Sequence, residues 1–223
     1  SGEKMKKTLI AALFVASAGA QAGVITVGGN DGTPTNGFTS SVGNCTIDFN
    51  DGTAANSCGA TYTLAAGSIV QSSVAGQYAT PAGDTSYYLT VGPSAGNNVQ
   101  VALNAQANYF GFYAGSLDTY NTVSFFLNDN EVDSFTGTAI NAVAFPGTGT
   151  TGNQAQAAYI NYYTTDAVQF NRVVFSSSSN AFETDNHSFA IATPPGQVPL
   201  PGTVALLGLG MAGLGAMRRR RIA

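Results

Sequence analysis

The fold that residues 23–195 can adopt is limited most by the lack of helix-forming runs in this segment. Leu is sparse, Lys and Glu are almost missing, and Gly, Thr, Ser and Asn recur about every eight to twelve residues. In residues 98–103, and again in 122–127, the second, fourth and sixth positions are apolar. A period of two in short runs between turn residues predicts half-buried β-strands.

Nine such runs predict an all-β domain over residues 23–195. We expect an antiparallel two-sheet sandwich of jelly-roll-like type, since helix signals are nearly absent. The expected strands are Thr61–Leu64, Ser68–Gln71, Ser86–Val91, Asn98–Leu103, Tyr109–Tyr113, Thr122–Leu127, Ala157–Thr164, Ala167–Ser176 and His187–Ala192. Loops are expected at residues 28–43, 92–97, 144–154 and 176–180.

Acidic side chains far outnumber basic ones between residues 23 and 200. Arg172 is the one basic residue there against eleven Asp and Glu, which gives a formal charge of 1 − 11 = −10. Nucleic-acid binding needs Lys and Arg to displace counterions, so nucleic acid is excluded as a partner. The acidic surface suits divalent cations, so calcium is possible, but no cofactor is required.

Cys45 and Cys58 are the two cysteines of the chain, in a segment dense with Asn, Gly, Asp and Thr. In an exported protein we expect them to form one disulfide. Closing a loop of about 14 residues would contribute about 3 kcal/mol to stability. A zinc site is not expected, because two cysteines and one distant histidine do not have zinc-ligand spacing.

Residues 1–22 have the three parts of a secretory signal peptide. Three lysines between positions 4 and 7 form a basic region, residues 9–15 form an apolar core, and Ala20-Gln21-Ala22 is a small-any-small cleavage sequence. We expect Met5 to be the initiator and export to use the Sec translocon. Signal peptidase would then leave Gly23 as the first residue of the mature chain.

The C-terminal segment joins a proline motif, an apolar run and a basic cluster. Residues 203–217 carry no charge, and a helix from Leu200 to the end of that run would be about 27 Å long, just short of a hydrocarbon core of ~30 Å. We therefore expect a single transmembrane helix at about 203–217. The cluster Arg218, Arg219, Arg220 and Arg221 would halt translocation and stay cytoplasmic.

Residues 196–223 resemble the PEP-CTERM sorting signal of Gram-negative bacteria, which an integral-membrane exosortase recognises. The resemblance rests on Val198-Pro199-Leu200-Pro201, the apolar run and the arginines, with Leu200 where that family usually has Glu. It implies an inner-membrane-tethered intermediate, processing near 198–201, and release to the cell surface or extracellular matrix. A plain tail anchor and a Gram-positive sortase signal are the alternatives, although Val204 replaces the Gly that a sortase requires.

Residues 109–125 and 170–175 are similar to ectodomains that often accompany such signals. The run 182–186, Phe-Glu-Thr-Asp-Asn, also resembles the last strand of carbohydrate-binding jelly rolls, where an Asp-Asn pair lies near a structural calcium. By this resemblance Asp185 and Asn186 are candidate ligands for a metal or a sugar.

Two further polar clusters could carry chemistry. Asp118, Tyr120 and Asn121 fall on an expected turn between aromatic strands, where their oxygens could meet a cation or sugar hydroxyls, or could simply form the turn. Residues 128–133 are expected to form a hairpin turn without a ligand, because Asn and Asp stabilise turns locally. His187 is the only histidine, and we expect it to be structural because no Gly-any-Ser-any-Gly motif supports a catalytic triad.

The adjacent pairs Tyr87–Tyr88 and Tyr162–Tyr163 should each turn one ring away from the core, where it could stack on sugars. Together these patterns predict a protein that is not an enzyme, with a structural or adhesive role in the envelope or in the exopolysaccharide of a biofilm. A carbohydrate-binding module, possibly calcium-dependent, is the second hypothesis. A secreted hydrolase is the third, since spacing alone cannot show two carboxylates across a cleft.

Overall fold

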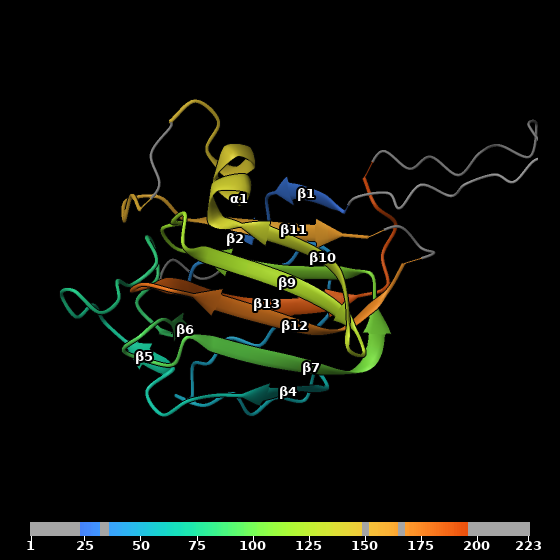
Figure 1. The fold of residues 1–223 in the computed structure, drawn as a ribbon, viewed down its shortest axis with the longest axis horizontal. Coiled ribbons are helices and arrows are strands. Elements are labelled where there is room, and N and C mark those ends of the chain that lie inside the picture. Colours follow the sequence, from blue (N-terminus) through green and yellow to red (C-terminus); the bar gives the residue numbers. More distant parts are fainter. Residues whose placement is uncertain (1–22, 32–35, 149–151, 165–167, 196–223) are drawn as a thin grey trace, which may run out of the picture.

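A computed structural model describes residues 23–31, 36–148, 152–164 and 168–195. Over these ranges two antiparallel sheets pack face to face, and one short helix lies beside them (Figure 1). The elements are β1 (Val24–Val27), β2 (Asn30–Asp31), β3 (Phe38–Thr39), β4 (Ala60–Thr63), β5 (Ile69–Gln71), β6 (Tyr87–Val91), β7 (Asn98–Ala107), β8 (Tyr109–Ala114), β9 (Asn121–Leu127), β10 (Asn130–Thr136), α1 (Gly137–Ala144), β11 (Ala158–Tyr163), β12 (Phe170–Ser177) and β13 (Phe182–Ala190).

Sheet I has six strands in the order β1-β11-β8-β13-β6-β5, and sheet II has five in the order β10-β9-β12-β7-β4. From β6 onward the chain changes sheet at each step except the β9–β10 hairpin. The neighbours β11-β8-β13-β6 facing β10-β9-β12-β7 give the strand order of a jelly roll, two Greek keys closed into a sandwich. The predicted antiparallel sandwich is therefore confirmed.

All nine predicted strands are present, as β4 to β9 and β11 to β13. Strands β1, β2 and β3 were not predicted, because they are short and lie in or next to a glycine-rich segment. Strand β10 was missed because it is polar and mostly exposed, and its pairing with β9 makes it a strand.

The short helix α1 was not predicted. Thr136 is its N-cap, and Oγ1 accepts a hydrogen bond from the N–H of Ala139 at 3.3 Å. Ile140 is fully buried and attaches the helix to the sandwich. The threonine cap followed by small and apolar residues was a signal available in the sequence.

The predicted signal peptide, with Ala20 and Ala22, and the predicted sorting segment 196–223 lie outside the described residues. So do the proposed processing motif, the helix at 203–217 and the arginine cluster. Within the described ranges, no helix is both long enough and apolar enough to span a membrane.

Apolar side chains from both sheets fill the space between them. Val99 and Val101 of β7 are fully buried, as the alternation predicted, and face Phe110 and Phe112 of β8 across the core. The rings of Phe112 and Phe175 meet edge to face, with centroids 5.3 Å apart. Each such ring buries on the order of 150–250 Å², so the phenylalanines dominate the hydrophobic stabilisation.

The other face of sheet I is covered as well, by two segments called here the covering segments: residues 28–31 with 36–46, and residues 72–84. The hydroxyl of Ser40 lies 2.7 Å from the hydroxyl of Tyr109, and Tyr88 donates a hydrogen bond to the carbonyl oxygen of Ser72 at 2.8 Å. The central strands of sheet I, β11, β8, β13 and β6, are thus buried on both faces. Their outer layer consists of hydrogen-bonded tyrosines and polar side chains.

The prediction that one tyrosine of each adjacent pair is exposed is wrong. The alternation itself holds, since Tyr162 stacks on Phe125 in the core and Tyr163 packs against Tyr109 on the outer face. Tyr163 and Tyr88 are nevertheless 5% and 0% exposed. The covering segments bury these rings, and nothing in the local period of two signals a third layer.

The predicted Cys45–Cys58 disulfide is present, with Cα atoms 5.7 Å apart. Between the cysteines, Ile47 pairs with His187 of β13 through two backbone hydrogen bonds. Soon after Cys58 the chain enters β4 of sheet II. The disulfide therefore closes the segment that connects the two sheets.

Candidate functional site

A pocket of about 520 Å³ lies where four connections of the sandwich meet. The first connection follows β8, the second precedes β11, and the third joins β12 to β13. In antiparallel sheets these three connections lie at the same end. The fourth is residues 73–79 of a covering segment. The side chains that matter most for its chemistry are those of Gln77, Tyr78, Asp118, Tyr120, Gln154 and Glu183.

Glu183 forms the floor of the pocket. It is 2% exposed, and its Oε1 accepts a hydrogen bond from the N–H of Ala79 at 2.9 Å. Its Oε2 has no hydrogen-bond partner. Burial, with a smaller contribution from Asp118, raises the pKa of Glu183 to about 7. This carboxyl group therefore changes charge near neutral pH, unlike an exposed glutamate.

Asp118 lies on the β8–β9 turn, where the sequence placed it, and lines the same pocket. Asn121 holds that turn, because its Oδ1 accepts a hydrogen bond from the N–H of Asp118 at 2.6 Å. The Asn121 amide also donates to Ser177 and Ala181 and is fully buried. Asn121 thus supports the pocket from behind and does not line it.

Tyr120 forms one wall of the pocket. Its hydroxyl donates a hydrogen bond to the carbonyl oxygen of Asn180 at 2.9 Å. Burial and the nearby Asp118 carboxylate raise the pKa of Tyr120 to about 12, so the hydroxyl stays neutral. Tyr78 is a second aromatic ring in the lining.

The lining combines aromatic rings, carboxyl groups and side-chain amides. These groups suit a ligand rich in hydroxyls, which needs hydrogen-bond partners and a flat apolar surface. The described lining contains no Lys or Arg, so it offers no counter-charge to a phosphate.

The other predicted ligands, Asp185 and Asn186, lie further along β13 and outside this pocket. The side chain of Asn186 donates hydrogen bonds to the carbonyl oxygens of Asn36 and Phe38, at 2.6 and 3.0 Å. It therefore fixes a covering segment to the sheet. The structure brings Asp118 together with Glu183, and it places Asp185 in a separate buried cluster.

Asp185 is fully buried, and neither of its carboxylate oxygens accepts a well-formed hydrogen bond. The backbone N–H of Asn186 and the carboxyl group of Asp84 are its nearest polar neighbours. Burial and then the neighbouring Asp84 raise the pKa of Asp185 to about 10. Asp84 is 5% exposed and has one unpartnered oxygen, Oδ2. Sequence reasoning missed Asp84, whose Pro-Ala-Gly-Asp setting is that of an ordinary turn.

Glu183 was, from the sequence, only one of several carboxylates that could serve a hydrolase, and its place in this pocket was not predicted although a signal was available. Glu183 and Asp185 alternate in a strand otherwise bounded by Phe and His. Two acids on one face of a central strand predict either an exposed face or a buried polar site. Because the covering segments lie over this face of β13, the two acids form a buried polar site.

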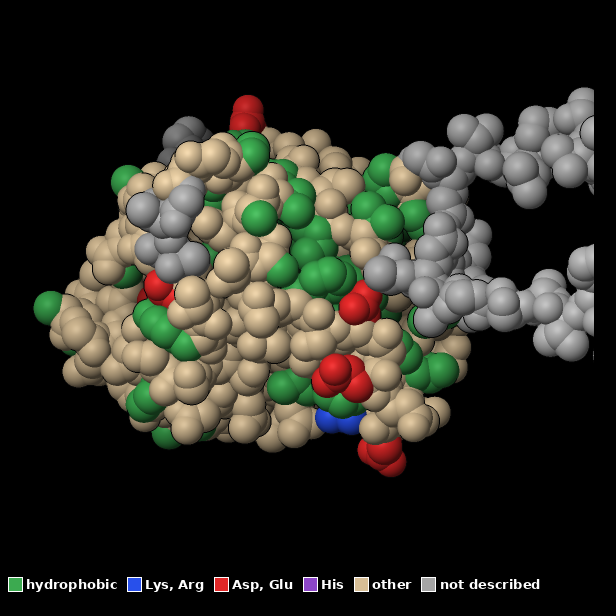
Figure 2. Space-filling view, turned by 45° about the horizontal axis from the view of Figure 1, so that its top comes forward, with side chains coloured by type: hydrophobic (Ala, Val, Ile, Leu, Met, Phe, Trp, Pro, Cys, Tyr) green, Lys and Arg blue, Asp and Glu red, His purple; other side chains and the backbone are tan. Residues whose placement is uncertain are grey.

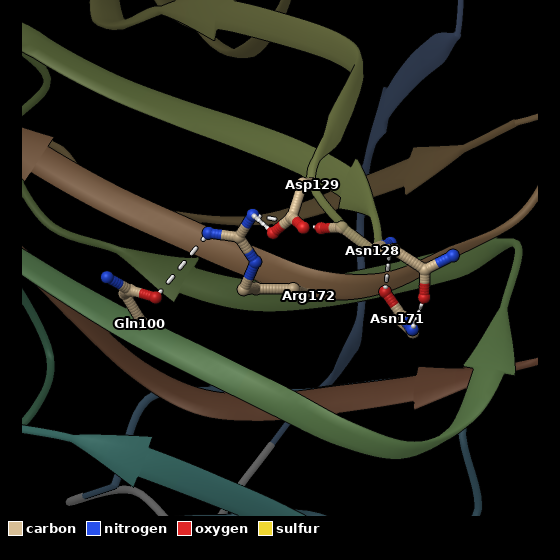
Figure 3. A network of polar contacts seen from close by, with 5 residues as sticks. All are labelled: Gln100, Asn128, Asp129, Asn171 and Arg172. Carbon is tan, nitrogen blue, oxygen red and sulfur yellow. Dashed lines mark hydrogen bonds and ion pairs between the residues drawn. The ribbon is translucent and has the colours of Figure 1, made fainter.

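Arg172 is the only basic side chain in the described ranges, and it belongs to a structural network on sheet II (Figure 3). Its guanidinium lies 4.2 Å from the ring centroid of Phe126 and donates to the carbonyl oxygen of Asn128 at 2.9 Å. Asn128 and Asn171 exchange two hydrogen bonds, at 2.8 and 3.0 Å. The predicted hairpin turn is present but shorter than expected: residues 128–129 form it and residues 130–133 belong to β10. Its polar groups hold the β9–β10 turn against β12.

His187 is structural, as expected. It is fully buried between the sheets, and burial lowers its pKa to about 3. The face drawn in Figure 2 carries isolated acidic side chains and one basic one, and hydrophobic side chains lie among the polar side chains and backbone.

A family model described as the PEP-CTERM protein-sorting motif matches residues 197–221. The match confirms the resemblance of the C-terminal segment and indicates an exported surface protein that is targeted to an exosortase. No curated protein and no solved structure matches the chain significantly.

Proposed function

We propose that the sandwich is released by an exosortase and then serves, without catalysing a reaction, as a polysaccharide-contacting component of the cell surface or extracellular matrix. The sorting motif at 197–221 carries the proposal of release. The pocket at Asp118, Tyr120 and Glu183 supports contact with a hydroxyl-rich polymer.

The release is tested by the intact mass of the protein in surface, medium and membrane fractions, with and without the exosortase. We expect a species that begins near Gly23 and ends before Thr203, only in cells that contain the enzyme. A chain that keeps its C-terminus in the membrane in both strains would make the protein tail-anchored.

Binding is tested with the released protein and the exopolysaccharide of the same cells, by affinity electrophoresis or calorimetry. Tyr120→Ala and Asp118→Asn should each weaken binding about tenfold or more, because each removes a contact of 1.4 kcal/mol or more in the pocket. The matched control is Asp129→Asn, an exposed carboxylate on sheet II. Equal affinities in all four proteins would rule out the pocket as the binding site.

A hydrolase is the second candidate, because one pocket holds a carboxyl group with a pKa of about 7 and a second carboxylate, Asp118. An acid with a raised pKa and a nearby base is the minimum for glycoside hydrolysis. New reducing ends that disappear in Glu183→Gln while binding remains would favour it. Binding without new reducing ends favours the non-catalytic role.

A further inference from the structure

The cluster of Asp84 and Asp185 is distinct from the pocket and has no use in the proposed function. Both residues are buried, at 5% and 0% exposure. Three of their four carboxylate oxygens accept no well-formed hydrogen bond from an N–H or O–H group, and the two carboxyl groups lie within hydrogen-bonding reach of each other. Buried polar atoms are almost always paired, and an unpaired buried carboxylate is among the costliest exceptions.

The side chains around the pair hold these two carboxyl groups in place. Asp84 Oδ1 accepts hydrogen bonds from the N–H and hydroxyl of Ser86, at 2.8 and 2.5 Å. This leaves Oδ2 as its unpartnered oxygen. Asp185 lies opposite Tyr113 in the β13–β8 pairing, just before a bulge, and Tyr113 donates a hydrogen bond to the carbonyl oxygen of Ala82.

No cationic side chain of the described ranges compensates the pair. Arg172 is on sheet II, held against Phe126 and Asn128. Both nitrogens of His187 are used, by Tyr62 and by Thr184. A positive charge that neutralises Asp84 and Asp185 must therefore come from outside the described chain, as a metal ion or as a proton.

We propose that Asp84 and Asp185 bind one divalent cation of the oxygen-preferring class of Ca²⁺, between sheet I and the covering segments. A metal ion can satisfy several oxygens of two neighbouring carboxyl groups together, whereas a shared proton joins only one oxygen of each. No group of three or more His, Cys, Asp or Glu side chains occurs in the described ranges. The remaining ligands would thus be backbone carbonyls and water, which Ca²⁺ accepts.

Such an ion would hold a covering segment on the sheet. Asp84 lies in the segment 72–84 and pairs through its backbone with Asn36 of the other covering segment, while Asp185 belongs to β13. An ion between them crosslinks three parts of the chain. The inference does not depend on glycan binding or on the fate of the C-terminus.

The test uses the purified, disulfide-bonded protein, stripped with EDTA and then titrated with Ca²⁺. We expect one ion per chain by native mass spectrometry. The Tm should rise by roughly 5–10 °C when Ca²⁺ is about 100-fold above its Kd. Asp84→Asn and Asp185→Asn should each lose most of this rise, and the controls Asp118→Asn and Asp129→Asn should keep it.

Two results would overturn the proposal. If neither Tm nor mass responds to Ca²⁺, and Asp185→Asn is more stable than the parent at every Ca²⁺ concentration, the pair holds a proton. If the parent and Asp185→Asn respond equally, the ion binds elsewhere.

Terbium provides a second measurement in case a variant fails to fold. Tb³⁺ is a luminescent substitute for Ca²⁺ that is excited through nearby tyrosine rings. The charges of Asp84 and Asp185 act on Tyr113, so its ring is the expected sensitiser. Tyr113→Phe should cut the emission at least several-fold while one ion still binds. Unchanged emission would contradict binding at this place.

Discussion

The Tyr62 hydroxyl lies 2.9 Å from Nδ1 of His187 and so connects β4 of sheet II to β13 of sheet I. On the other side of the ring, Nε2 lies 2.9 Å from Oγ1 of Thr184. The imidazole also stacks on Phe175, with centroids 5.0 Å apart. A polar ring with both nitrogens hydrogen-bonded can be buried in this core at little cost in free energy. Removing either partner leaves a buried nitrogen unpaired and lowers the stability of the fold.

Tyr62→Phe should lower the free energy of unfolding by roughly 1–3 kcal/mol, because it leaves a buried imidazole nitrogen without a partner. Urea unfolding at pH 7 followed by circular dichroism measures this change. Tyr87→Phe, at a half-buried ring of sheet I, is the control and should have a smaller effect. Equal losses in both variants would show that the Tyr62–His187 contact is not special.

His187 should make the fold sensitive to acid. Its folded pKa of about 3 lies below its ordinary value of 6.5, so the unfolded chain takes up a proton that the folded chain refuses. The stability contributed by the neutral ring is complete above pH 6.5 and is lost as the pH falls from 6.5 toward 3. The stability difference between the parent and His187→Gln should be constant above pH 6.5 and shrink below it. A constant difference down to pH 4 would contradict this.

The effect of Glu183 on the pH dependence of stability should be opposite to that of His187. Its folded pKa of about 7 lies above its ordinary 4.5, so its contribution is present below pH 4.5 and is lost as the pH rises through 7. Glu183→Gln should therefore equal the parent near pH 4 and exceed it by about 3 kcal/mol at pH 8. Unfolding free energies at both pH values test this. Asp118→Asn, at a more exposed carboxylate of the same pocket, should not gain stability with pH in this way.

Removing the Cys45–Cys58 disulfide should destabilise the fold by about 3 kcal/mol, because the unfolded chain regains the entropy of a 14-residue loop. The double variant Cys45→Ser, Cys58→Ser is compared with the parent by urea unfolding. Reduction of the parent with a phosphine is the independent check. If both treatments leave the stability unchanged, the segment between the sheets is held by Ile47 and Phe49 alone.

The backbone nitrogen of Gly23 lies 2.8 Å from Oδ2 of Asp133. Cleavage after Ala22 would turn this nitrogen into an ammonium group and the hydrogen bond into an ion pair. The mature chain should then be about 1 kcal/mol more stable than one that keeps Ala22, and Asp133→Asn should erase the difference. N-terminal sequencing with unfolding at low and high salt tests both parts. A mature start elsewhere, or no salt dependence, would contradict it.

The strands of the core were predictable because the alternation of apolar and polar residues lies within each strand itself. Residues 98–103 and 122–127 alternate with a period of two. Strand β7 buries its apolar positions, and β9 buries Val123 and Phe125 but leaves Leu127 half-buried. Strand β10 and the helix α1 were less accessible. β10 becomes a strand by pairing with β9, and α1 depends on a threonine cap and one buried isoleucine.

The pocket was only half predictable. Asp118 lies on a turn that its own sequence favours, so it could be placed between two strands. Glu183 joins it because β13 lies beside β8 in sheet I, a neighbour relation that no spacing encodes. Tyr163 shows the same limit, since its outward direction was predictable and its burial was not.

The amino-acid sequence alone was enough to identify the sorting signal, the disulfide and the alternation of the strands. Each depends on residues close together in the chain or, for the cysteines, on there being only one possible pair. The tertiary structure was needed to bring Asp84 beside Asp185 and to bury both. They are about a hundred residues apart, and their meeting depends on covering segments that are held by long-range hydrogen bonds. Such contacts depend on the whole fold, whereas the hydrophobic period of a segment predicts only its own secondary structure and which of its residues share a face.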